Sequence, residues 1–420
     1  MTVGMRSFSA SIAVVLAFIF NTLVGPDAYG EVAFINSVTL VLGVTVSLGA
    51  DRLLLRHVVI VRGAEYPSRA LAMAKIFSQR LLLISTLVVI AVLGVAYVLL
   101  DRRLWVPLAI ALPVVPLTAL TRVRQGILNG MGYVRESQSP EYVFRPIFLT
   151  LLASAILVGN FQSIRTPEGV AFLLSLAALC SFTYSAFLLR NHTKVGADPD
   201  HNGPSLVRGL GWGRESVLLL LFNVAWVANS QLGTILVRYL HTSFDAGTYD
   251  FLNKAAEVVS FSSIAVGAMV APKIAQSYSG QSHEKLGLLM RQARILGLTL
   301  AVPLSLGVLG IWFLGARWVG RDAAASFLPL VVLCVGQIIF SALGPMAVLA
   351  VMTGHTAVSA TAIGAASLLL VPLAYALTRN WGLLGAAYAQ SAALVAWSVA
   401  IFVVSRSWPP HGNKHTDTAE

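Results

Sequence analysis

Long apolar runs without a formal charge alternate with short polar segments along the whole chain. The first run, Ser7 to Pro26, has 20 uncharged residues, and the second, Val32 to Ala50, has 19. A helix needs about 20 apolar residues to cross the roughly 30 Å of bilayer hydrocarbon. The pattern predicts an all-α polytopic membrane protein with about 12 transmembrane helices. We expect them at about 5–24, 29–50, 76–100, 104–126, 138–159, 167–189, 214–238, 246–271, 292–315, 323–352, 357–378 and 381–404.

Composition agrees with this class and accounts for the net charge. Of the 420 residues, 57% are hydrophobic and 11% are charged, whereas a soluble domain carries about 25% charged residues. A net charge of +11 could suggest nucleic-acid binding, but in a membrane protein it reflects basic inner loops. With both termini cytoplasmic, about 20 of the 29 lysines and arginines fall on the inner side. Cys180 and Cys334 lie in apolar runs, so we expect neither a disulfide framework nor a metal site.

The two halves of the chain show a weak internal repeat. Thr166 to Arg190 aligns with Gly382 to Arg406 at a constant offset of 216. The repeat predicts two pseudo-symmetric six-helix lobes, an arrangement typical of transporters. We place the N-terminal lobe at 1–190, a cytoplasmic linker at 191–213, the C-terminal lobe at 214–405 and a cytoplasmic tail at 406–420.

The stretch from Leu23 to His57 organises the first half, and parts of it return in the second. Gly25-Pro26-Asp27 cannot continue a helix and predicts a tight outer turn. Tyr29 follows, where an aromatic ring suits the membrane interface. A crossing comes next, and Arg52 and Arg56 mark its basic inner exit.

Short motifs spread over nearly the whole chain carry a family resemblance. They are Leu23–Gly30, Gly49–Arg52, Asp245–Tyr249, Ala271–Ala275, Met352–Gly354 and Trp381–Ala387. With these motifs the chain resembles the polysaccharide-biosynthesis flippases. These are O-antigen and exopolysaccharide translocases of the multidrug/oligosaccharidyl-lipid/polysaccharide exporter superfamily. The chain departs from the family pattern at His355, where the family has another basic residue.

The resemblance implies a V-shaped pair of lobes that alternate between inward- and outward-facing states in the bacterial inner membrane. The implied substrate is a sugar or oligosaccharide on a polyprenyl (pyro)phosphate, moved from the inner to the outer leaflet for surface polysaccharide synthesis. A polysaccharide polymerase and chain-length proteins are partners implied in the same way. No cofactor, metal or nucleic acid is expected.

Ionisable residues inside the predicted crossings are the best site candidates, because each costs about 2.5–3.5 kcal/mol to insert near the centre of a membrane. Arg145 lies about two turns inside the fifth crossing, four residues after Glu141. The eighth crossing carries Asp250, Lys254 and Glu257 on one face. Arg145 and Lys254 are candidates for binding the lipid phosphate, and Asp250 and Glu257 for ion coupling. Structural ion pairs within each group are an equally open interpretation.

Further arginines cluster toward the inner side and together could receive a phosphate headgroup. They are Arg52, Arg80, Arg122, Arg124, Arg291 and Arg294. Each alone is more simply a positive-inside anchor. Uncharged polar groups inside the crossings could bind sugar hydroxyls, although bonding between helices is their commoner use. They are Asn21, Asn36, Asn223, Asn229, Gln231 and Gln337.

Two other functions compete with the flippase hypothesis. A cation-coupled multidrug exporter of the same superfamily would need a membrane-embedded acid in the first lobe, where only Glu31 and Glu141 are near crossings. A membrane enzyme such as a polymerase or ligase would need a sizeable outer loop with catalytic groups. The outer loops here are short, and the sequence has no acid–base or metal-ligand spacing and no phosphate-binding G-x-x-x-x-G-K-[ST] loop. We therefore expect a transporter rather than an enzyme.

Overall fold

The described part of the chain is helical throughout. The structure is a computed structural model that describes residues 2–60, 66–159, 161–193, 214–279, 283–315, 323–343, 349 and 356–406. Within these residues every regular element is a helix, as the sequence pattern predicted.

Helices α1 to α9 form the N-terminal lobe. Their bounds are α1 Thr2–Val24, α2 Pro26–Ser47, α3 Ala50–Ile60, α4 Tyr66–Leu99, α5 Arg102–Ala111, α6 Val114–Gly130, α7 Val134–Ser139, the π-helical turn η1 Pro140–Phe144, α8 Arg145–Val158, the short 3₁₀ turn η2 Gln162–Ile164, and α9 Pro167–Thr193. In this half, two apolar spans contain more than one element: α5 with α6, and α7 with η1 and α8.

The remaining helices form the C-terminal lobe. Their bounds are α10 Arg214–Leu240, α11 Ser243–Glu257, the 3₁₀ turn η3 Val258–Ser260, α12 Phe261–Ser279, α13 His283–Gly315, α14 Ala323–Leu343 and α16 Thr356–Arg406. Gly382 breaks α16 with a φ of 56°, which a residue with a side chain rarely adopts. The break separates the predicted eleventh and twelfth crossings.

The described residues account for twelve crossings. Ten stretches are long and apolar enough to span a membrane. One of them, Ile363–Val403, has 41 residues and contains the Gly382 break, so it supplies two crossings. Helix α10 adds another, because it has 22 uncharged residues between Glu215 and Arg238.

Two basic segments contain helix: one that the sequence predicts to be a loop, and one that it predicts to be amphipathic. The loop expected after the second crossing holds all of α3 and the first turns of α4, which begins at Tyr66. The basic segment after the eighth crossing includes the end of α12 and the start of α13. The physical reason is that lysine and arginine favour helix as well as water. A charge therefore marks where the apolar crossing ends, not where the helix ends.

The break between the first two crossings lies where the sequence predicted it. Helix α1 ends at Val24, Gly25 has a φ of 85°, and α2 begins at Pro26. Proline suits the first helical position, since its missing N–H needs no partner there. A second break separates α2 from α3, where Leu48 and Gly49 have φ values of 49° and 68°.

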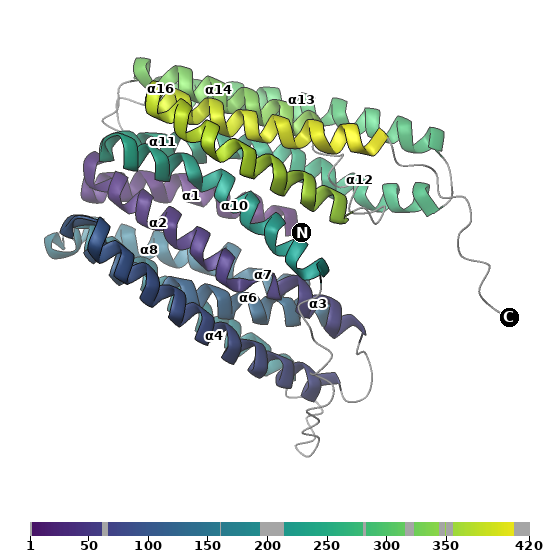
Figure 1. The fold of residues 1–420 in the computed structure, drawn as a ribbon, viewed down its shortest axis with the longest axis horizontal. Helices are drawn as coiled ribbons and strands as arrows, with labels where there is room; N and C mark the ends of the chain where they lie inside the picture. The colour runs from purple at the N-terminus through teal and green to yellow at the C-terminus, as the bar shows by residue number, and fades with distance from the viewer. Residues whose placement is uncertain are drawn as a thin grey trace.

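The two lobes join at one end and diverge at the other (Figure 1). Contacts between the lobes run mainly from α2 to α10 and α11, and from α1 to α11. A single hydrophobic core at this end contains Tyr29 of α2, Tyr249 of α11 and Ala387 of α16. At the other end the lobes have separate cores, one around Leu54 and the other around Trp397. This is the V shape that the resemblance implied.

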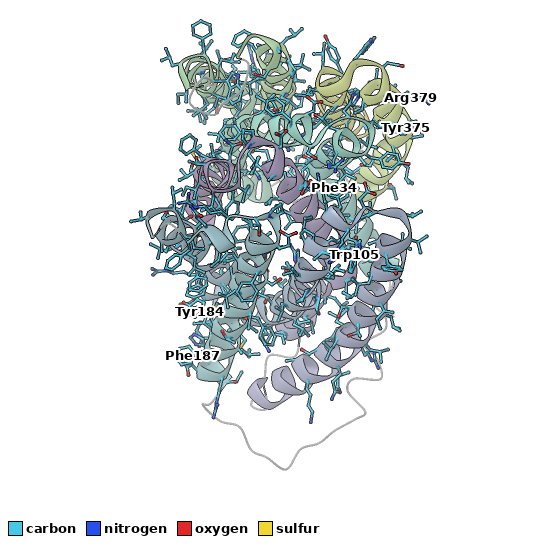
Figure 2. The ribbon with its side chains drawn as sticks, turned by 90° about the vertical axis from the view of Figure 1, so that its left-hand side faces the viewer. Phe34, Trp105, Tyr184, Phe187, Tyr375 and Arg379 are labelled. Atoms are coloured by element: carbon cyan, nitrogen blue, oxygen red, sulfur yellow. The ribbon has the colours of Figure 1, made fainter. Side chains whose placement is uncertain are left out.

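Large apolar side chains cover the outside of both lobes. On α4, Leu87 and Val98 are 60% and 77% exposed, and on α13 Ile311 is 74% exposed. Figure 2 shows Phe187 and Tyr375 on the outside of the two lobes. Exposed apolar surface of this extent marks contact with a membrane rather than with water.

Candidate functional site: a cationic cavity beside the interlobe seam

A cavity of about 260 Å³ lies in the N-terminal lobe, bordered by α1, α2, η1, α8 and α9. Its walls are mainly apolar, with Ala13 and Phe20 among the residues that α1 contributes. The charged residues that line it are Glu141, Arg145 and Lys254. Lys254 comes from α11 of the other lobe, so the cavity is completed across the boundary between the lobes.

The π-helical turn η1 positions the two N-terminal charges. The backbone N–H of Arg145 donates to the carbonyl of Pro140, five residues earlier, and the Ser181 hydroxyl donates to the same oxygen at 2.9 Å. Pro140 and Pro146 flank the turn and carry no N–H of their own. Single π turns within α-helices often occur at functional sites. This turn carries Glu141 and ends at Arg145.

Glu141 pairs with a residue that the sequence did not suggest. Arg122 Nη2 of α6 donates to Glu141 Oε1 at 3.3 Å, with the two side chains 16% and 18% exposed. Helical spacing indicated Arg145 as the partner. The wider π turn changes the neighbours of both residues, and Glu141 bonds to α6 instead. Among the described residues, Arg145 forms no ion pair with an acid.

Lys254 takes part in a small network that joins the lobes. Its Nζ lies 2.5 Å from Asp250 Oδ2, the four-residue spacing predicted within α11. The Tyr29 hydroxyl of α2 donates to the same carboxylate oxygen at 2.5 Å, and Lys254 Nζ donates to that hydroxyl at 3.3 Å. Asp250 is 2% exposed and Tyr29 is 1% exposed. Tyr29 therefore lies inside the protein rather than at the membrane interface.

A second polar network lies inside the C-terminal lobe. The Tyr249 hydroxyl donates to Gln390 Oε1 at 2.5 Å, and Gln390 Nε2 donates to Asn253 Oδ1 at 2.6 Å. Asn253 Nδ2 in turn donates to the Ser230 carbonyl at 2.9 Å and to Glu257 Oε1 at 3.5 Å. This network links α10, α11 and α16, and it explains how Glu257 is held.

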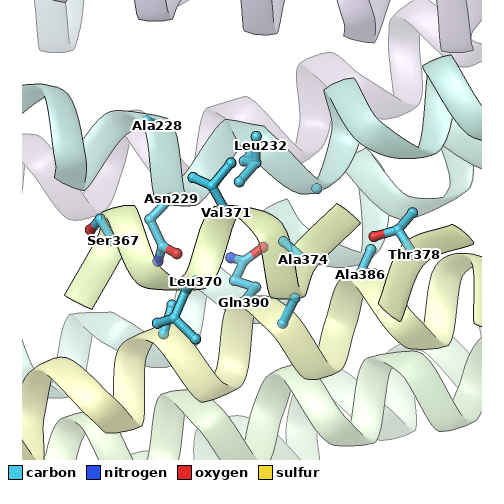
Figure 3. Close-up of a pocket in the computed structure, with 13 residues that line it drawn as sticks. Ala228, Asn229, Leu232, Ser367, Leu370, Val371, Ala374, Thr378, Ala386 and Gln390 are labelled. Carbon is cyan, nitrogen blue, oxygen red and sulfur yellow. The ribbon is translucent and has the colours of Figure 1, made fainter. Parts of the chain in front are cut away.

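A pocket of about 70 Å³ adjoins this network between α10 and α16. Figure 3 shows Asn229 of α10 and Gln390 of α16 directed toward the space between the helices. Its lining residues carry no formal charge. A pocket of this volume has room for water bound to the two amides.

An apolar groove of about 620 Å³ runs on the other face of α1. Val15 and Phe18 of α1 line one side, and Phe251 and Ala255 of α11 line another. Trp312 of α13 contributes to the remaining wall. Ala255 follows Lys254 in the chain, so the groove and the cationic cavity share α1 and α11.

Among the described residues, the other arginines predicted as a phosphate cluster do not line the cavity. Arg80 of α4 and Arg291 of α13 are exposed. Arg294 lies over the ring of Phe402, 4.9 Å from its centroid. Arg52 belongs to α3, but its side chain lies outside the described residues. Arg122 contacts the cavity lining through its ion pair with Glu141.

Sequence reasoning missed Tyr29, Asn253 and Gln390 as members of buried networks. Only Gln390 carried a signal, that of a polar residue within an apolar run, which Asn36 and Gln231 share, whereas Tyr29 and Asn253 lie close to charged residues. Asn36 lines the cavity. Gln231 Oε1 accepts a hydrogen bond from the Ser37 hydroxyl at 2.8 Å, which joins α10 to α2 as the expected bonding between helices.

Comparisons with known proteins show which fold the chain has. No protein-family model and no curated protein sequence matches the chain. Solved structures match over nearly its whole length. One is an inward-facing multidrug resistance MATE family transporter of the MOP superfamily, with a TM-score of 0.67, 13% identity, and coverage of 95% of this chain and 94% of that one. Another is the eukaryotic MATE transporter AtDTX14, with a TM-score of 0.64, 14% identity, and coverage of 97% and 94%.

A flippase has a similar fold. Lipid II flippase MurJ in an inward closed conformation matches with a TM-score of 0.62, 12% identity, and coverage of 96% of this chain and 86% of that one. At 12–14% identity these likenesses show the fold alone, and the apolar helices show a polytopic membrane protein. The chain therefore shares the fold of the MATE transporter and MurJ flippase structures, and this fold is consistent with the resemblance to the polysaccharide flippases.

Proposed function

We propose that the protein is an alternating-access flippase for a sugar or oligosaccharide linked to a polyprenyl (pyro)phosphate. It moves this substrate from the inner to the outer leaflet of the bacterial plasma membrane for surface polysaccharide synthesis. The observation that carries the proposal is Arg145, a cation that faces a membrane cavity without an ion pair among the described residues. Such a charge costs about 2.5–3.5 kcal/mol to insert, and an anionic ligand would offset that cost.

Phosphate suits the cavity because of the two cations that line it. The planar fork of an arginine matches phosphate oxygens with paired hydrogen bonds, and a lysine adds a mobile point charge. Glu141 also lines the cavity, but its Oε1 accepts from Arg122, a third cation that offsets part of its charge. Asn36 adds an amide that suits a sugar hydroxyl.

The apolar groove suits the lipid part of the same substrate. It lies against α1 and α11, the two helices that also border the cationic cavity. A polyprenyl chain in the groove and its phosphate in the cavity would lie on opposite faces of α1. A soluble cationic drug has neither a lipid chain to fill the groove nor a phosphate to bind the cations of the cavity.

The two ends of the V are compatible with the proposed direction of transport. The lobes join where α2 and α11 begin and diverge at the other end. By the positive-inside rule the joined end is the outer one and both termini are cytoplasmic. The cavity is then positioned for loading from the inner leaflet. A polymerase and chain-length proteins would receive the translocated substrate outside.

Deletion of the gene tests the proposal in cells. We expect loss of the surface polysaccharide and accumulation of lipid-linked sugar on the inner leaflet. Wild type should restore the polymer, whereas Arg145→Ala should not. Arg80→Ala is the matched control, because it removes an exposed arginine outside the cavity. Normal polysaccharide after deletion would overturn the proposal. Energised efflux of a cationic dye from liposomes would favour the multidrug exporter instead.

A further inference from the structure

The contact between the lobes, here called the interlobe seam, follows one line along α2. At its outer end, Gly30 lies against Ser243 and Gly247 of α11. A side chain on Gly30 would overlap the backbone carbonyl of Ser243. Beside Gly30, Tyr29 bonds to Asp250, and farther in along α2, Ser37 bonds to Gln231. Small residues allow this close approach of two helix backbones in a membrane.

Asp250 is the charged centre of the seam. Its Oδ2 atom accepts from both the Tyr29 hydroxyl and Lys254 Nζ, each at 2.5 Å. With 2% exposure, its charge has little access to solvent and depends on these two donors. Removing the cation from a buried carboxylate leaves a charge that favours hydration, which requires the surrounding structure to open.

Lys254 belongs to the seam and to the cavity at once. Its ammonium donates to Asp250 and lies 5.8 Å from the centre of the Tyr29 ring. Its side chain is 21% exposed, and it lines the same cavity as Arg145. One flexible side chain therefore connects the ligand space to the contact that holds the lobes together.

We propose that a phosphate in the cavity opens the seam by taking Lys254 away from Asp250. The anion binds Arg145 and draws the Lys254 ammonium toward itself. Asp250 then keeps only the hydroxyl of Tyr29, and water must reach its carboxylate, which separates α11 from α2. Ligand binding and opening of the outer end become one event. This inference rests on the proposed phosphate site. It adds an exchange, in which Lys254 leaves Asp250 for the phosphate, and this exchange couples ligand binding to lobe movement.

Distance measurements between spin labels test this coupling. The labels replace Phe161 and Trp381, two exposed residues at the outer ends of the two lobes, in a variant without Cys180 and Cys334. The probe is farnesyl pyrophosphate, and farnesol is its uncharged control. We expect the pyrophosphate to lengthen the distance between the labels and farnesol to leave it unchanged.

Two variants separate the exchange from simple binding. Asp250→Asn removes the buried carboxylate that must be hydrated when Lys254 leaves, so pyrophosphate should no longer open the outer end. Its Kd should nevertheless fall about tenfold, because no carboxylate competes for Lys254. Tyr29→Phe keeps the ring and its packing but removes the hydroxyl. It should shift the distances part of the way toward the open state. Arg80→Ala should behave as wild type.

Binding and distance together decide the outcome. Isothermal titration first establishes whether the pyrophosphate binds the wild type. Binding without a change in distance would overturn the exchange and leave the proposed phosphate site intact. An absence of binding would overturn the phosphate site, and the exchange with it. If the distances between the labels in wild type and Asp250→Asn were the same, both with and without pyrophosphate, the exchange would also be overturned.

Discussion

Replacing Gly30 with alanine should force the lobes apart at their outer end. Gly30 lies in the first turn of α2, where it touches the first turn of α11. A Cβ at this position would overlap the carbonyl of Ser243 and lie 3.1 Å from the backbone nitrogen of Gly247. Both neighbours are backbone atoms, so neither can rotate away as a side chain would. The two helices must separate to admit the methyl group.

The size of the effect follows from the cost of that overlap. Forcing an extra methyl group into a close-packed contact typically costs about 1–3 kcal/mol. A cost of about 2 kcal/mol changes an equilibrium about thirtyfold, because each 1.36 kcal/mol is a factor of ten. The overlap exists only while the lobes are joined at this end. A protein that is about 99% closed would therefore fall to about 75–80% closed.

The spin labels at positions 161 and 381 measure this shift directly. We expect the Gly30→Ala variant to show a second, longer distance that is minor in the wild type. Gly94→Ala is the matched control, since no atom lies within 4 Å of the Cβ it would add. Identical distance distributions for wild type and Gly30→Ala, in protein that is folded and monodisperse, would refute the reasoning about the seam.

Two further predictions concern the buried networks. Tyr249→Phe should destabilise the C-terminal lobe by about 1–3 kcal/mol, because the buried Gln390 oxygen loses its donor. Thermal unfolding in detergent should show this loss, and Tyr97→Phe, at a 70% exposed tyrosine, should not. Glu141→Ala should cost about 3–5 kcal/mol, because Arg122 keeps its charge with little solvent around it. The double change with Arg122→Met should recover much of that loss, and full additivity of the two single effects would contradict the pairing.

The crossings could be predicted from the sequence because the membrane itself selects them. An uncharged apolar run of about 20 residues has the length and composition of a helix that spans a bilayer. The break at Gly25 and Pro26 followed from local backbone chemistry in the same way. The helix α3 did not, because its basic residues suit both helix and loop. The π turn at Pro140 was also missed, since nothing in residue spacing distinguishes it from an α-helical turn.

The candidate site could be predicted only in part. Helical spacing correctly paired Asp250 with Lys254, four residues apart on one helix. The third residue of this network, Tyr29, is 221 residues away from Asp250 in the chain. Which face of α2 meets which face of α11 depends on how the lobes pack, and hydrophobic periodicity does not specify that register. For the same reason, the sequence did not predict that the partner of Glu141 comes from α6. Nor did it predict that the described inner arginines are not gathered in one place.

Translocation by purified protein tests the central claim most directly. Liposomes would contain a polyprenyl pyrophosphate carrying a fluorescent sugar, and a membrane-impermeant quencher added outside would report how fast the sugar changes leaflets. We predict fast translocation with wild type and with Arg80→Ala. With Arg145→Ala, the rate should fall by at least about tenfold, because a charged contact to phosphate is removed. Equal rates for all three proteins, or for protein-free liposomes, would contradict the claim that this cavity carries a lipid-linked phosphate.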